Sequence, residues 1–226
     1  TQIRTLGVKA LVIECDVTRE EDLTRAVKET VLMFGKIDVA VANAGFGVIG
    51  PFEKLSLADF RRQFDTNVDG VIRTAHAVIP ELKKTQGTLL IVGSVMGFVA
   101  MPQAAPYAMS KFAVRALAES LYYELKPQKV KVQYIAPGFV QTEIYQVNNK
   151  GQHIESTKDS VPAWLRMPAD QAAREIVNRS RSCAREVVIT GHGKWIVFFQ
   201  RHCPWLISAI MSRFITRHRA EARVSD

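Results

Sequence analysis

A tyrosine and a lysine near the middle of the chain have the spacing of a proton-transfer pair. Tyr107 and Lys111 are four residues apart, so on a helix they share one face. An ammonium beside a phenol favours the phenolate and lowers the tyrosine pKa from about 10. A tyrosine in that setting can give or take a proton near neutral pH. Ser94, upstream, can donate a hydrogen bond to the same substrate oxygen.

The Tyr-x-x-x-Lys spacing alone is common and is usually a surface pair, so its setting matters. Ser94 ends an apolar run and is flanked by Gly93 and Gly97, which we interpret as leaving room for a substrate. For this chemistry, the end of that run must lie beside the start of the helix that carries Tyr107.

Apolar segments of strand length alternate with segments of helical periodicity along the chain. The segments predicted to be strands are Ala10–Val17, Ile37–Gly45, Thr88–Ser94, Val130–Gly138 and Glu186–Thr190. In the segments between them, apolar residues recur every three or four positions, which predicts helices. These helices are predicted within Arg19–Phe34, with Gly35 as the stop, over Leu57–Ile79, from Tyr107 to Leu125, and from about Pro168.

Strands that are apolar throughout, separated by amphipathic helices, indicate a parallel sheet covered on both faces. We therefore predict an α/β fold with a doubly wound parallel sheet, Rossmann-like, over residues 1–193. Ligands of such folds bind beyond the carboxyl ends of the strands. Small or polar residues occupy those ends here, at Asp16–Val17, Asn43–Gly45, Gly93–Ser94 and Pro137–Gly138.

Six short motifs, in order along nearly the whole chain, resemble those of the short-chain dehydrogenase/reductase family. They are CDVT with Asp16 and Val17, ANAG with Asn43, Ala44 and Gly45, NVDG with Asn67, GSVMG with Ser94, YAMSK with Tyr107 and Lys111, and PGFVQT with Pro137, Gly138, Val140 and Thr142. The resemblance implies an NAD(P)-dependent oxidoreductase. The nicotinamide cofactor would carry the hydride.

The resemblance also implies a role for each motif residue. Ser94 would orient the substrate oxygen, Tyr107 would act as general acid in reduction and general base in oxidation, and Lys111 would assist Tyr107. Asn67 would hold a water that passes the proton to solvent. The cofactor would be bound by Asp16 and Val17 at the adenine, Asn43, Ala44, Gly45, Tyr107 and Lys111, and Pro137, Gly138, Val140 and Thr142 at the nicotinamide. Substrate contacts are expected from Ser94, Tyr107, Met96 and Tyr145.

One part of the family pattern has no counterpart in these residues. The family opens with a strand and a glycine-rich turn, Thr-Gly-x-x-x-Gly-x-Gly, that binds pyrophosphate at a helix N-terminus. In the family's sheet order, 3-2-1-4-5-6-7, the first β-α-β segment is therefore lacking. Three explanations are open: a fragment of a longer product, a shortened sheet in which strand 3 pairs directly with strand 4, or a non-catalytic relative. We expect residues 1–226 alone to bind NAD and NADP weakly.

Charge and cysteine content limit the partners. The formal net charge is +8, with many basic residues after position 200, and this favours NADP over NAD. The body of the chain shows no interleaving of aromatic and basic residues, so we predict no nucleic-acid binding. Cys15, Cys183 and Cys203 are far apart, without metal-ligand spacing, so we predict no metal and a cytoplasmic location.

Two apolar segments bear on substrate and surroundings. Ile144, Tyr145, Val147, Trp164 and Leu165 could form a lid over the substrate or simply pack on the body. The aromatic and basic extension, residues 194–226, is too interrupted to span a bilayer. Its residues 194–219 suit a helix at a membrane surface, a dimer contact or a substrate entrance.

Two classes of function therefore remain open. The leading interpretation is an oxidoreductase acting on a hydrophobic secondary alcohol or ketone, as a homo-oligomer with peripheral membrane contact. The alternative is a non-catalytic scaffold or interaction protein of the same fold, or an inactive fragment.

Overall fold

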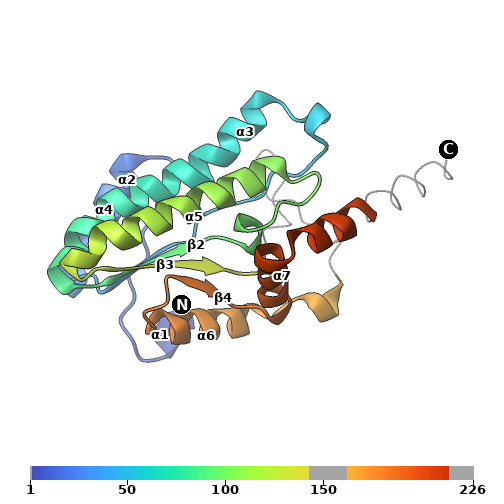
Figure 1. Ribbon diagram of the computed structural model, residues 1–226. Helices are drawn as coiled ribbons and strands as arrows, with labels where there is room; N and C mark the ends of the chain where they lie inside the picture. The colour runs from blue at the N-terminus through green and yellow to red at the C-terminus, as the bar shows by residue number, and fades with distance from the viewer. Residues whose placement is uncertain (1, 143–161, 214–226) are drawn as a thin grey trace.

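The predicted parallel α/β sheet is confirmed by a computed structural model, which describes residues 2–142 and 162–213 (Figure 1). Four parallel strands follow one another in the order β1-β2-β3-β4 within this part of the chain. They are β1 (Val39–Ala42), β2 (Thr88–Val92), β3 (Lys131–Ala136) and β4 (Glu186–Val188). The order corresponds to strands 4-5-6-7 of the expected seven, so the first β-α-β segment has no counterpart in the described sheet.

Helices cover both faces of the sheet, as Figure 1 shows. On one face lie α2 (Glu20–Phe34), α4 (Gly70–Thr85) and α5 (Ala105–Leu125); on the other lies α6 (Ala169–Ser180). The remaining elements are α1 (Gln2–Thr5), α3 (Leu57–Phe64), α7 (Gly191–His202), the π-helical turn η2 (Asp65–Asp69), and the 3-10 turns η1 (Phe52–Lys54), η3 (Val95–Gly97), η4 (Lys126–Gln128) and η6 (Ala163–Leu165).

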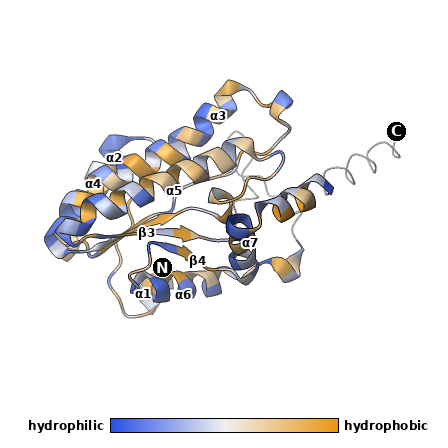
Figure 2. Cartoon of the chain, in the orientation of Figure 1, coloured by the Kyte–Doolittle hydropathy of each residue, from blue (hydrophilic) through white to orange (hydrophobic). Residues whose placement is uncertain are grey.

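Alternate residues of the central strands fill two hydrophobic layers. Leu89 and Ile91 of β2 pack towards α4 and α5, whereas Leu90 packs towards α6. In β3, Tyr134 joins the first layer and Ile135 the second. Most strand residues are accordingly apolar, although Lys131 and Glu186 begin β3 and β4, while the helices carry polar residues on their outer sides (Figure 2). This is the pattern expected of a sheet that is buried on both faces.

The predicted helix over Leu57–Ile79 is interrupted. Ser56 and Asp59 form a capping box that begins α3, and α4 continues to Thr85. Between them η2 widens the helix for one turn and carries Asn67. Apolar spacing alone does not reveal such an insertion, because the residues on either side keep a helical period.

The predicted strand over Ala10–Val17 is wrong. The segment does not join the sheet, and Val12 is 85% exposed. A strand needs a neighbour at about 4.8 Å, and none of the four described strands flanks this segment. Polar contacts hold it against α2 instead, including a 2.7 Å bond from Arg25 Nη2 to the Glu14 carbonyl. Direct pairing of this segment with β1, one of the three explanations, is therefore also wrong.

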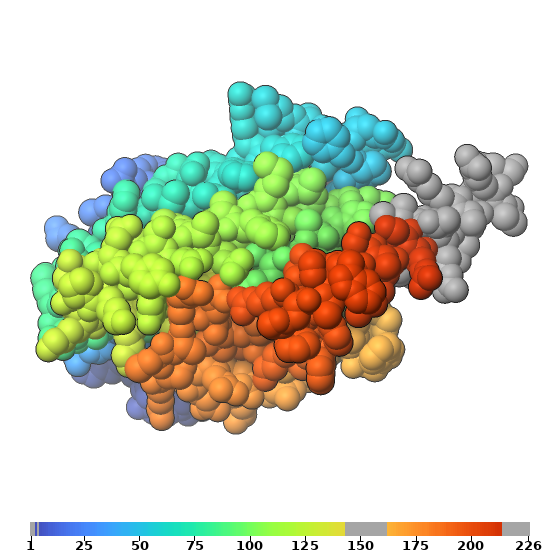
Figure 3. Space-filling model, viewed as in Figure 1, coloured from blue at the N-terminus to red at the C-terminus, as the bar shows by residue number. Residues whose placement is uncertain are grey.

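The C-terminal segment packs one side on the core and exposes the other. Helix α7 runs through residue 193, which is the predicted boundary between the Rossmann-like part and the C-terminal extension. Helical structure resumes at residues 204–213. Val197 and Ile207 are buried in the layer shared with α5, whereas Trp195 and Trp205 are 65% and 70% exposed. Figure 3 shows this segment, in red, on the surface beside α5. Among the described helices, none is long and apolar enough to cross a membrane.

Candidate active site

Ser94 lies where β2 ends and η3 begins. Its Oγ accepts a hydrogen bond from the Met96 amide at 3.1 Å, which caps the turn. The Val95 amide donates to the Pro137 carbonyl at 2.8 Å, so the end of β2 is tied to the loop that follows β3. Ser94 is buried and Met96 is half-buried. The structure thus brings the serine motif and the start of the PGFVQT motif together.

Tyr107 and Lys111 lie on one face of the first turns of α5. Lys111 is only 6% exposed, and its Nζ donates to the Val92 carbonyl at 3.2 Å, two residues before Ser94. The same Nζ lies 5.5 Å from the centre of the Tyr107 ring. Burial lowers the pKa of Lys111 from 10.5 to about 8. An ammonium is therefore held next to a half-buried phenol at the carboxyl end of the sheet.

Asn67 is buried within η2 and joins two parts of the site. Its Nδ2 donates to the Phe46 carbonyl at 3.0 Å and to Ser110 Oγ at 3.2 Å, and its Oδ1 accepts from the Phe46 amide at 3.1 Å. The expected cofactor turn, Asn43–Gly45, is exposed beside it. A Cβ at Gly45 would lie 3.1 Å from the Asn67 Oδ1, so the turn approaches the amide closely.

A cavity of about 480 Å³ brings the first two motifs together. It is lined by Glu14, Cys15, Asp16, Val17, Arg19, Asp22, Ala44 and Thr66. The Asp16 carboxylate accepts from the Thr18 amide and hydroxyl at 2.9 and 2.8 Å, and these bonds lower its pKa. This cavity holds the residues expected at the adenine; Arg19 and Thr66 were not anticipated from the sequence.

The loop after β3 is held by a residue that the sequence analysis missed. His192, in the first turn of α7, accepts a hydrogen bond from the Phe139 amide at 3.0 Å, and the two rings stack. A Cβ at Gly138 would lie 2.3 Å from the His192 Nε2, so only glycine fits there. Val140 is bridged to Met167 and Thr142 is exposed, whereas Ile144, Tyr145 and Val147 lie outside the described residues.

Tyr134 of β3 is the second residue that the sequence analysis missed. Its hydroxyl accepts from the Ser94 amide at 3.0 Å and lies 2.9 Å from the Ser94 carbonyl and 3.4 Å from the Lys111 carbonyl. The interpretation of Gly93 and Gly97 as room for substrate is wrong, because a Cβ on either would lie 2.0 to 2.1 Å from Tyr134 atoms. The only signal in the sequence was a tyrosine in a buried strand, whose hydroxyl needs a partner.

The described residues fit the two ends of a dinucleotide. The cavity around Asp16 lies beside Ala44, just after β1, where an adenine could enter. Lys111 and the loop after β3 lie at the carboxyl ends of β2 and β3. The Thr-Gly-x-x-x-Gly-x-Gly turn that would hold a pyrophosphate does not occur among residues 2–142 and 162–213. Gly191 and Gly193 open α7 after β4, but without this spacing. Within the same residues, no group of three or more His, Cys, Asp or Glu side chains could hold a metal ion.

Known proteins show the same pattern over most of the chain. Residues 1–153 match the family described as short chain dehydrogenase. Retinol dehydrogenase 8 of Bos taurus is 38% identical over 139 residues, which cover 61% of this chain and 44% of that protein. L-fucose dehydrogenase of Oryctolagus cuniculus is 34% identical over 138 residues, with 61% and 49% covered. The chain therefore spans about half the length of these curated relatives.

A solved structure extends the likeness to the arrangement of the sheet. The alcohol dehydrogenase of the archaeon Thermococcus sibiricus, complexed with 5-hydroxy-NADP, is 26% identical. It superposes with a TM-score of 0.71, covering 83% of this chain and 77% of that one. The family match extends over more than half of the 226 residues, and the parallel strand order agrees with it. The chain belongs to the short-chain dehydrogenase/reductase family.

Proposed function

We propose that the protein is an NAD(P)-dependent oxidoreductase that interconverts hydrophobic secondary alcohols and ketones by a Ser-Tyr-Lys-Asn mechanism. The observation that carries the proposal is the buried Lys111 ammonium beside Tyr107. Removing an ammonium from water is costly, and an apolar side chain could fill the same volume without that cost. A strongly perturbed lysine at a strand end is typical of a functional site rather than of a scaffold.

Proton transfer would centre on Tyr107. In reduction its hydroxyl would give a proton to the substrate oxygen, and in oxidation the phenolate would take it back. The Lys111 ammonium stabilises the phenolate because the two groups carry opposite charge. Ser94 Oγ accepts a hydrogen bond from the Met96 amide, so the hydroxyl proton of Ser94 can still be donated to the substrate oxygen. The two hydroxyls would thus hold one oxygen.

Asn67 would support this transfer through its position in η2. Both amide protons are used, on the Phe46 carbonyl and Ser110, so the side chain fixes the cofactor turn to α5. A water that relays protons from Lys111 would therefore be held by an oxygen of Asn67. A π-helical turn leaves main-chain carbonyl groups without their usual helical partner, which suits this role.

A dinucleotide would complete the site by supplying or accepting the hydride. Asp16 and Val17 would contact its adenine, Asn43–Gly45 its middle, and Lys111 with Pro137, Gly138, Val140 and Thr142 its nicotinamide end. The net charge of +8 favours NADP, and the similar alcohol dehydrogenase is complexed with 5-hydroxy-NADP. Both observations support NADP over NAD as the preferred cofactor.

The substrate proposal is tested by comparing a hydrophobic secondary alcohol with L-fucose, the sugar in the name of one relative. Trp164, one of the expected lid residues, is 84% exposed and offers an apolar surface near the Val140–Met167 bridge of the loop after β3. We expect the full-length protein with NADP to oxidise 2-decanol, a hydrophobic secondary alcohol, with a kcat/KM at least about 10-fold above that for L-fucose, since burying one large apolar group is worth that factor. Faster oxidation of L-fucose would contradict the hydrophobic substrate class. If the protein oxidises neither alcohol and reduces no ketone of a panel with NADPH, the proposal that it is an oxidoreductase is contradicted.

We also propose that the exposed aromatic side of the C-terminal segment contacts a membrane surface. Trp195, Phe198, Trp205 and Ile210 are exposed on it, and Lys194 and Arg213 lie in the same segment. Aromatic rings with basic neighbours favour the interface of anionic lipid.

Replacing two tryptophans should therefore release the protein from vesicles. We expect Trp195→Ala with Trp205→Ala to lower co-flotation with phosphatidylserine-containing vesicles by about 10-fold or more, because each ring would bury apolar area in the interface. Leu32→Ala, on the exposed side of α2, is the matched control. Equal flotation of both variants would assign the surface to another partner, and a change of mass in light scattering would identify a contact between copies.

A further inference from the structure

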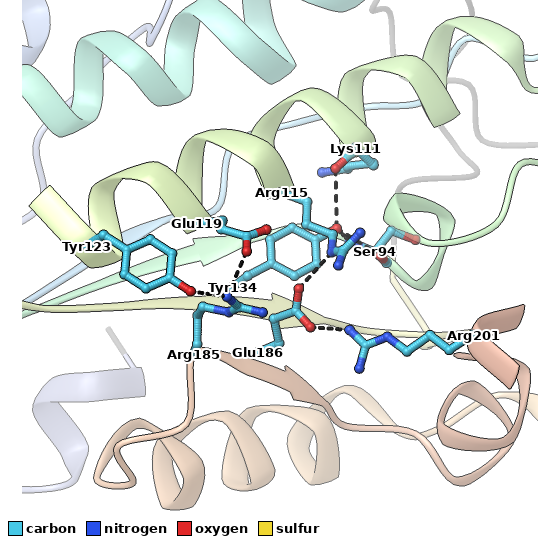
Figure 4. A network of polar contacts seen from close by, with 9 residues as sticks. All are labelled: Ser94, Lys111, Arg115, Glu119, Tyr123, Tyr134, Arg185, Glu186 and Arg201. Carbon is cyan, nitrogen blue, oxygen red and sulfur yellow. Dashed lines mark hydrogen bonds and ion pairs between the residues drawn. The ribbon is translucent and has the colours of Figure 1, made fainter. Parts of the chain in front are cut away.

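We propose that Tyr134 is a positioning residue for the reaction, one that fixes Ser94 relative to the turn of α5 that carries Lys111. The inference rests on the proposed function. Tyr134 stands on β3, its side chain is 1% exposed, and it points between the end of β2 and α5 (Figure 4). It does not touch the substrate position directly, so its effect would pass through the two residues that its hydroxyl contacts.

One phenolic hydroxyl joins both elements. Its oxygen accepts from the Ser94 amide at 3.0 Å, and its single proton lies between the Ser94 carbonyl at 2.9 Å and the Lys111 carbonyl at 3.4 Å. Ser94 stands just beyond the last ladder residue of β2, between the Gly93 and Val95 amides, which donate to the Ile135 and Pro137 carbonyls at 2.8 Å each. The Tyr134 hydroxyl adds a contact to the amide and the carbonyl of Ser94 itself.

The residues that surround the Tyr134 ring hold it in a single position. A Cβ at Gly93 would lie 2.0 Å from the Tyr134 ring, and one at Gly97 would lie 2.1 Å from the hydroxyl. Phe98 packs edge-on against the ring, 5.8 Å between centres. The backbone turn on either side of Ser94 is therefore shaped around this tyrosine.

Charged side chains brace the same pocket from β4 and α7. The Arg115 guanidinium lies 4.2 Å from the Phe98 ring centre and donates to Glu186 at 2.7 Å. Arg201 of α7 binds the other oxygen of Glu186, as Figure 4 shows. Because burial raises the pKa of Tyr134, its hydroxyl stays protonated and keeps its donor role at neutral pH. Tyr134 is thus a fixed hydrogen-bonding group rather than a second acid.

Tyr134→Phe in the full-length protein removes only the hydroxyl and keeps the ring. We expect kcat to fall by about 10-fold or more, because the buried Ser94 amide loses its acceptor while the Ser94 carbonyl keeps only the Gly97 amide as a donor. The KM for the dinucleotide should change less than about 2-fold. Hydrogen–deuterium exchange at the Ser94 amide should become faster, whereas exchange at Leu90 should not change. Tyr123→Phe, which removes a hydroxyl bound to Arg185 at the protein surface, is the matched control and should change neither quantity.

Lower kcat together with faster exchange at Ser94 supports the proposal. Faster exchange at Ser94 with kcat within about 2-fold of the parent would mean that Tyr134 has only a structural role. Lower kcat with unchanged exchange at Ser94 would mean that the loss of activity does not pass through Ser94. Each of these results overturns the proposal. If Tyr134→Phe does not fold, Phe98→Leu removes the ring that packs edge-on against Tyr134 and should give the same pair of changes; its failure to do so overturns the proposal. A parent protein without turnover would overturn the proposed function, and with it this role.

Discussion

Replacing Tyr107 by phenylalanine is expected to lower turnover by about 100-fold or more while the protein stays folded. The ring remains, so packing on α5 is preserved, but the group that gives and takes the proton is lost. General acid–base catalysis by a positioned side chain contributes about 100-fold to 10,000-fold. The free energy of unfolding should change by no more than about 1 kcal/mol, since the residue is half-buried.

The measurement is steady-state turnover with NADP and the best alcohol, beside a dinucleotide titration of the same sample. We expect the variant to bind the dinucleotide as the parent does, because the hydroxyl acts on the substrate. Tyr123→Phe serves as control for the loss of a hydroxyl on the same helix. Turnover by Tyr107→Phe within a few-fold of the parent would show that another group transfers the proton.

The parts of the fold that the sequence predicted are those with a local cause. Helix α2 ends at Gly35, whose φ of 79° places it in the left-handed region, and its amide caps the helix on Val31. The central strand β2 is apolar from Leu89 to Val92 because both faces are covered. Tyr107 and Lys111 share a face because their spacing is that of a helix. Each of these follows from fewer than a dozen consecutive residues.

The parts that the sequence did not predict depend on neighbours far along the chain. Ala10–Val17 has the composition of a strand, but a strand requires a partner, and none of the described strands is beside it. Tyr134 meets Ser94 across 40 positions, and His192 meets Phe139 across 53. Those contacts exist only because parallel strands bring their carboxyl ends to one edge of the sheet. A single sequence carries no local trace of them.

Replacing Lys111 by methionine is expected to move activity and stability in opposite directions. Activity should fall by about 100-fold, because the phenolate of Tyr107 loses the charge that favours it and the dinucleotide loses a contact. Stability should rise at neutral pH. The pKa of Lys111 falls from 10.5 to about 8 on burial, which corresponds to a cost of about 3 kcal/mol. Loss of the bond to the Val92 carbonyl offsets about 1 kcal/mol of that gain.

The gain in stability should depend on pH in a defined way. Between pH 8 and 10.5 the unfolded chain binds more protons at this lysine than the folded chain does, so the parent becomes more stable as the pH rises. Methionine does not titrate. The advantage of the variant should therefore be full below about pH 8 and should be lost by about pH 10.5. Above that pH only the missing bond to the Val92 carbonyl remains, so the variant should be about 1 kcal/mol less stable than the parent.

The most direct test of the proposed site is to measure turnover and urea unfolding for Lys111→Met and for the parent at about pH 7 and about pH 10. The account predicts a variant that is about 2 kcal/mol more stable at the lower pH, with turnover reduced by about 100-fold. That combination would mean that a buried ammonium is retained for the reaction at the expense of the fold. A variant that keeps the parent's turnover, or that loses stability and activity together, would contradict it and make Lys111 a structural residue.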